Sequence, residues 1–216
     1  MTRLTCVFTV AIGVALGGAT PAAAETPAEF YKGRTVTVVQ ASEPGGAYDL
    51  YARFFGNHAF KHIPGNPSVV QQYMPGAGGV RAANYLYNAA PQDGTVIGML
   101  EQGTALDKVL RDDPTMKFDL AKFHWIGTVG GDTWMIGVWH TAPVASIQGA
   151  REHEVLLGSS GKSSTTYIYP MLINAIGGTR FKPILGYKGA PEMDLAMERG
   201  ETHGRGGTWA AWKTRQ

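Results

Sequence analysis

Four glycine- and serine-rich turns carry the residues of this chain that are best suited to hold a negatively charged small molecule. Each turn follows a short apolar run and opens a helix-like pattern; the turns are PGGAYD at 44–49, PGAGG at 75–79, GSSGKSS at 158–164 and GYKGAPE at 186–192. Backbone N–H groups at such helix starts, together with the helix dipole, attract anions without a cationic side chain. Several of these turns meeting at one cleft predict a site for a small organic anion.

The first turn also contains a carboxylate. Gly45 and Gly46 allow a backbone approach that a side chain would block. Asp49 follows in the first helical turn, where it is favourable to the dipole but would repel a bound anion. We therefore expect Asp49 to hold the shape of the loop and to pair with Arg53, one turn further on.

The sequence GSSGKSS is close to a nucleotide phosphate loop but lacks its spacing. Only two residues separate Gly158 from Gly161, where that motif needs four before Gly-Lys-Ser. Its hydroxyl residues are expected to cap a helix and to donate hydrogen bonds to a small anion.

Residues with catalytic chemistry form no recognisable constellation. The nucleophile motif Gly-x-Ser-x-Gly is absent, and His58 and His62 lack the glutamate of a zinc-protease motif. The sequence thus predicts no metal, no cofactor and no enzymatic activity, although an exported α/β enzyme acting on an acidic substrate remains an alternative.

The N-terminus, residues 1–24, has the sequence pattern of a secretory signal peptide. Arg3 is followed by an apolar stretch at 4–16 and by the small residues Ala22 and Ala24 before Glu25. An uncleaved membrane anchor is the alternative. Without these 24 of 216 residues, 192 remain, with no cysteine and with 18 basic against 17 acidic residues, because Arg3 and Cys6 are lost. The near-neutral charge and the lack of a basic block predict no nucleic-acid partner.

The positions of apolar residues predict alternating strands and helices. Strands are expected at 34–40, 69–73, 95–100, 125–129, 134–139, 154–158 and 181–186, and helices at 47–61, 80–90, 105–112, 164–175 and 191–199. This alternation indicates an α/β fold with mostly parallel sheets. The pattern changes near 130–142, which predicts a first domain at 25–130 and a partial second domain at 131–216. The last stretch, 202–216, begins like a strand and turn and then stops without completing a unit.

Three longer stretches resemble a known family. They are FYKGRTVTVVQASEPGGAYDLYAR at 30–53, MPGAGGVRAANYLYNAAPQDGTVIG at 74–98 and GYKGAPEMDLAMERGE at 186–201. They are similar to the substrate-binding proteins of tripartite tricarboxylate transporters, the Bug family. The resemblance implies a periplasmic binding protein type II-like fold, in which two α/β domains close over a carboxylate and deliver it to membrane permease subunits. A sensory module that signals to a membrane partner is a further alternative.

The resemblance also implies which residues bind the ligand. The family's ligand loops correspond here to Gly45, Gly46, Ala47 and Tyr48; Gly76, Ala77, Gly78 and Gly79; Gly103 and Thr104; Ser159, Ser160, Gly161, Ser163 and Ser164; and Tyr187, Lys188 and Gly189. We expect Gly45, Gly46, Ser160 and Ser163 to contribute most, through backbone amides more than side chains. Lys188 is expected to pair with a second carboxylate.

Length is where the sequence departs from the family. Family members continue well past residue 216, so the resemblance implies that roughly a third of the usual chain is missing. Strand edges and apolar helix faces would then be uncovered. We expect this chain to fold poorly or bind weakly by itself.

Overall fold

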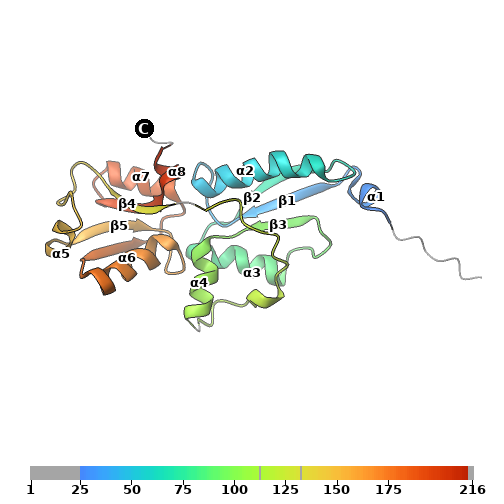
Figure 1. The fold of residues 1–216 in the computed structure, drawn as a ribbon. Coiled ribbons are helices and arrows are strands. Elements are labelled where there is room, and N and C mark those ends of the chain that lie inside the picture. The colour runs from blue at the N-terminus through green and yellow to red at the C-terminus, as the bar shows by residue number, and fades with distance from the viewer. Residues whose placement is uncertain (1–24, 112, 132, 214–216) are drawn as a thin grey trace, which may run out of the picture.

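The computed structural model describes residues 25–111, 113–131 and 133–213, which form two α/β lobes joined side by side (Figure 1). The first lobe is built on a sheet of strand order β2-β1-β3, and the second on a sheet of order β4-β7-β5-β6. The predicted signal peptide lies outside the described residues. Within them, no helix has the length and apolar character needed to cross a bilayer.

The first lobe alternates strands and helices, as predicted. Its elements are α1 (Pro27–Tyr31), β1 (Thr35–Gln40), α2 (Ala47–Ala59), η1 (Phe60–His62), β2 (Ser68–Tyr73), η2 (Ala77–Gly79), α3 (Val80–Asn88), β3 (Val96–Met99), α4 (Gln102–Leu110) and η3 (Leu120–Lys122). Strand β1 pairs in parallel with both neighbours. Its side chains alternate between the faces, so Val36 and Val38 pack towards α2 while Val39 packs towards α3.

The second lobe repeats this arrangement around a different sheet. Its elements are β4 (Trp134–Val138), α5 (Gly149–Glu152), β5 (Val155–Ser159), α6 (Thr165–Gly177), β6 (Phe181–Leu185), α7 (Ala190–Glu198), β7 (Gly204–Thr208) and α8 (Trp209–Lys213). Strand β5 pairs in parallel with β6 and β7, whereas β4 and β7 are antiparallel. Val155 and Leu157 of β5 form the centre of its core with Phe181.

Most predicted elements and the α/β fold class with mostly parallel sheets are confirmed. The strand predicted at 125–129 is wrong, because this segment has no strand partner in the structure. Trp125 instead contacts the ring of Phe123, and its indole N–H donates to the carbonyl of Leu120 at 2.9 Å. The helix predicted from residue 105 begins three residues earlier, at Gln102. The predicted domain boundary at 130/131 stays a prediction.

The last described stretch differs most from expectation. Residues 204–208 do complete a unit, because β7 lies between β4 and β5 within the sheet and leads into α8. Three glycines in one strand are unfavourable by propensity alone. Here they are required by packing, since a β-carbon at Gly206 would overlap the indole of Trp134 and one at Gly204 would overlap the backbone of Gly137.

We predict that Leu157→Ala lowers the free energy of unfolding by about 2 to 5 kcal/mol, because it leaves a cavity in the centre of the second lobe. Leu157 is 0% exposed. Leu185→Ala, on the neighbouring strand at 43% exposure, is the matched control, with an expected change below about 1 kcal/mol. Urea unfolding followed by circular dichroism measures both, and equal effects would contradict the assigned core.

Candidate functional site

A small cavity lies between the two lobes, where four helices begin. Residues at the starts of α2, α4, α6 and α7 line it, together with residues of β4, β7 and α8. Its volume is about 80 Å³. The lining residues are Ser42, Gly46, Ala47, Tyr48, Glu101, Gln102, Trp134, Ser160, Ser164, Thr165, Thr166, Gly189, Ala190, Met193, Arg205, Gly206, Gly207, Thr208 and Ala211.

The helix starts place main-chain N–H donors around this cavity. The first N–H groups of an α-helix have no partner within the helix, and the dipole places partial positive charge there. Gly46 and Gly189 are the N-caps of α2 and α7, and neither helix has a side-chain cap. At α6, the hydroxyl of Ser164 accepts the amide of Thr166 at 3.2 Å. The cavity is therefore bordered by main-chain donors from both lobes.

Two buried side-chain groups at the cavity have no hydrogen-bond partner among the described residues. They are the hydroxyl of Ser42 and the indole N–H of Trp134. Buried polar atoms in folded proteins are almost always satisfied, so these two groups are available to an acceptor such as water or a ligand. The sequence reasoning missed both residues, because neither belongs to a glycine-rich turn.

The first loop is held by Asp49, as the sequence predicts. Its carboxylate accepts the amide of Gly45 at 2.8 Å, and it also accepts from Arg53 at 2.9 Å, Tyr73 at 2.7 Å and Gln40 at 3.2 Å. Burial alone would raise the pKa of Asp49, but these hydrogen bonds outweigh burial and lower it. The predicted supporting role and the pairing with Arg53 are confirmed.

Backbone contacts between glycines bring the two lobes together. A β-carbon at Gly78 would lie 2.6 Å from the amide nitrogen of Ser164, and β-carbons at Gly103 and Gly161 would overlap backbone atoms of the opposite lobe. The hydroxyl of Ser163 donates to the carboxylate of Asp107 across the same contact, at 2.6 Å. Asp107 is also paired with Arg111. Gly78, Gly103, Gly161, Ser163 and Asp107 form this interlobe contact outside the cavity lining, whereas Ser164 belongs to both.

Glu101 is a buried carboxyl group within the site. It is the N-cap of α4, is 5% exposed and hydrogen-bonds to the hydroxyl of Ser164 in the other lobe. Burial raises the pKa of Glu101 to about 7, although the bond from Ser164 opposes this rise. Next to it, the hydroxyl of Tyr48 accepts the amide of Gln102 at 3.2 Å, and burial raises the pKa of Tyr48.

Arg205 is the cationic residue among those that line the cavity. It is 1% exposed and forms two hydrogen bonds to Asp194, at 2.5 and 3.2 Å, so its charge is balanced. Its guanidinium also lies over the ring of Trp212, 4.1 Å from the ring centre. Because Arg205 is in the last predicted strand-like stretch, no local motif marked it as part of a site.

The structure brings together part of the predicted site. Gly46, Ala47, Tyr48, Ser160, Ser164 and Gly189 line the cavity. The predicted residues outside the lining are Gly45, Gly76, Ala77, Gly78, Gly79, Gly103, Thr104, Ser159, Gly161, Ser163, Tyr187 and Lys188. Several of these have other partners; for example, the hydroxyl of Thr104 donates to the carbonyl of Gly78 at 2.8 Å, and Lys188 pairs with Glu43 at 3.7 Å.

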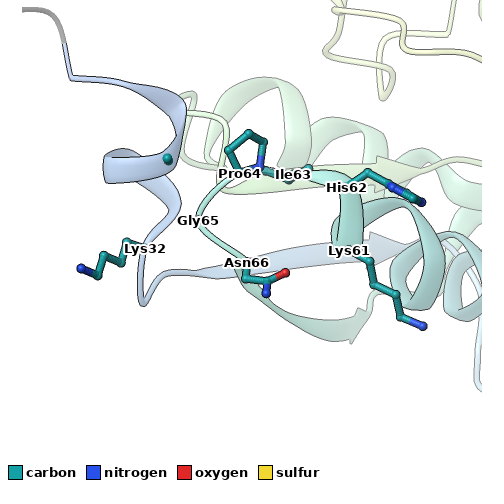
Figure 2. A pocket seen from close by; sticks show the side chains of 8 residues that line it. Lys32, Lys61, His62, Ile63, Pro64, Gly65 and Asn66 are labelled. Atoms are coloured by element: carbon teal, nitrogen blue, oxygen red, sulfur yellow. The ribbon is translucent and has the colours of Figure 1, made fainter.

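A second, larger pocket lies at the end of the first lobe that carries α1 (Figure 1). Its volume is about 560 Å³, and Figure 2 shows the side chain of Lys32 directed away from those of Lys61 and His62. All three are exposed. This shallow surface lacks the converging helix starts of the interlobe cavity. No group of three potential metal ligands occurs in the described part of the chain.

Comparison with solved structures identifies the fold. A Rhodopseudomonas palustris protein solved with adipate has a TM-score of 0.63 at 23% identity, covering 84% of this chain and 61% of its own. MatC from the same organism, solved with malate, has a TM-score of 0.68 at 18% identity (81% and 60% covered). The periplasmic binding protein BugD has a TM-score of 0.64 at 19% identity (82% and 60% covered).

These neighbours show that the chain has the fold of periplasmic binding proteins, as the sequence predicts. The chain spans about 60% of the length of the solved structures that it matches. No protein-family profile matches the sequence, and no curated protein shows significant similarity to it.

We predict that Gly161→Ala separates the lobes. The added methyl group would overlap the backbone of Gly78, which cannot move aside as a flexible side chain can. We expect a larger radius of gyration in small-angle scattering and a loss of about 1 to 3 kcal/mol of stability. Gly130→Ala, where a β-carbon meets nothing within 4 Å, is the matched control. Identical scattering from both variants would contradict the assigned contact.

We also predict that stability depends on pH through Glu101. Because its pKa is higher in the folded chain than the ordinary 4.5, the folded state binds the extra proton, and stability decreases as the pH rises from about 4.5 to about 7. In Glu101→Gln this contribution, up to about 3 kcal/mol, should be absent. Urea unfolding at several pH values measures the difference, and parallel curves for the two proteins would contradict the assignment.

Proposed function

We propose that this chain belongs to a periplasmic solute receptor that captures a small organic carboxylate between its two lobes. The observation that carries the proposal is the interlobe cavity, where four helix starts and the unpaired donors of Ser42 and Trp134 converge. A carboxylate fits this set of donors, since its two oxygens accept several hydrogen bonds and its charge is favourable at helix N-termini.

The structural neighbours support the same class of ligand. Two of them were solved with adipate and malate, which are both dicarboxylates. BugD, a further neighbour, is named as a periplasmic binding protein, and the three sequence stretches described above resemble the Bug family. Together, motif and fold support a receptor role and membership of that family more than an enzymatic one.

Ligand capture requires the lobes to move. A volume of about 80 Å³ is well below the roughly 300 to 1,000 Å³ of typical small-molecule sites. We take the described arrangement to be the closed one, which the glycine contacts and the bond from Ser163 to Asp107 would hold. A ligand that contacts both lobes stabilises closure, because it binds the closed form more tightly than the open one.

The receptor's partner is proposed to be the membrane permease of a tripartite tricarboxylate transporter. A closed lobe arrangement offers such a permease a surface that differs from that of the open form. Export by residues 1–24 would place the receptor in the periplasm, where it meets both ligand and permease.

We predict that dicarboxylates such as malate or adipate raise the melting temperature of the purified chain. At a ligand concentration about 100 times the dissociation constant, the stabilisation is about 2.7 kcal/mol, or roughly 5 to 10 °C. The corresponding diamides, which lack the negative charges, should have no effect. A thermal-shift screen measures this.

Gly46→Leu should abolish the shift, because the side chain would fill the cavity between the starts of α2 and α7. Gly130→Leu, in open space on the connecting segment, is the control that should retain it. If the diamides stabilised the chain as well as the acids, or if both leucine variants behaved alike, the anion site would be refuted.

A further inference from the structure

Glu101 brings a negative charge to a cavity built for an anion. Glu101, at the start of α4, lines the cavity together with the starts of the other three helices, and its carboxyl group accepts a hydrogen bond from Ser164 of the other lobe. It is 5% exposed, so water cannot screen it well. A ligand carboxylate at the same helix starts would lie next to this group.

The other charged and titratable groups in and around the cavity do not compensate the charge of Glu101. From β7 and α7, Arg205 and Asp194 neutralise each other. From α2, Tyr48 uses its hydroxyl to accept the amide of Gln102. Tyr169 of α6 interacts electrostatically with Tyr48 and helps to raise the pKa of that side chain.

Two more charged groups lie further from the cavity. On the helix of Glu101 itself, Asp107 is held by Arg111 and Ser163. Lys188, near the start of α7, pairs with Glu43 outside the cavity lining. Among the residues that line the cavity, no positive charge is therefore left over to hold two carboxylates.

We propose that Glu101 takes up one proton when a carboxylate binds, so that ligand capture by this receptor is coupled to protonation. The proposal rests on the proposed function above and adds its regulation by pH. The proton comes from the solvent and ends on a carboxyl oxygen of Glu101; no bond to carbon changes. Protonated Glu101 then donates a hydrogen bond where the ionised group would repel the ligand.

Repulsion between like charges and the ready availability of a proton both favour the coupling of ligand binding to protonation. Like charges a few ångströms apart in a buried site interact strongly, so one of two neighbouring carboxylates remains protonated. The proton is also readily available, since burial already raises the pKa of Glu101 to about 7 in the closed chain. Near neutral pH, capture thus needs only a small further shift of this equilibrium.

The test is isothermal titration calorimetry of the full chain with malate and with adipate, in two buffers of different ionisation enthalpy. The buffer dependence of the heat gives the number of protons taken up per ligand. We expect this number to rise towards one above about pH 7, and the dissociation constant to increase about tenfold per pH unit there. Below about pH 6 both effects should vanish.

Two variants locate the proton. Glu101→Gln keeps the shape and a donor but cannot ionise, so it should bind without proton uptake and with little pH dependence. Glu154→Gln, which neutralises an exposed carboxylate paired with Lys182, should behave as the unsubstituted chain does.

Each outcome is decisive. If the unsubstituted chain bound either acid without proton uptake between about pH 7 and 8, the coupling would be overturned whatever the variants did. Proton uptake that persisted in Glu101→Gln would place the proton on a group other than Glu101 and overturn the coupling too, while leaving the receptor role intact. Failure of the unsubstituted chain to bind either acid at any pH would overturn both the receptor role and the coupling.

Discussion

Direct contact between the backbones of the two lobes is the constraint on which the site depends. Gly78 and Gly103 of the first lobe and Gly161 of the second leave no room for a β-carbon at the point of contact. The field of a helix terminus falls off within about one turn. Only an approach this close lets the starts of α6 and α7 act on the same small volume as those of α2 and α4.

Buried charges support the loops around the cavity without adding net charge to it. In the first lobe, Asp49 holds the loop that precedes α2, and in the second, Arg205 and Asp194 pair beneath the cavity wall. Such groups are stable only when each charge is matched, and removal of one partner is costly. In the receptor proposed above, the attraction for an anion would therefore come from oriented main-chain donors, and the ionisation of Glu101 would change the charge of the site.

Local sequence patterns predicted the parts of this site that are formed by consecutive residues. The turn with Gly46, the turn with Ser164 and the turn with Gly189 each open a helix and reach the cavity, and the role of Asp49 depends on a contact within five residues. The turn at 75–79 also opens a helix, but it lies at the interlobe contact. Position along the chain did not distinguish a turn that lines the cavity from one that packs against the other lobe.

The amino-acid sequence by itself determined the alternation of strands and helices, the α/β class and the glycine- and serine-rich helix starts, because these follow from periodicity and turn chemistry over a few residues. Only the tertiary structure decided that Gly204–Thr208 becomes an inner strand, since the indole of Trp134 requires glycine there. It also decided that Ser42, Trp134, Glu101 and Arg205 share one cavity. Those residues are far apart in the chain, and their burial and charge balance exist only once both lobes are folded and in contact.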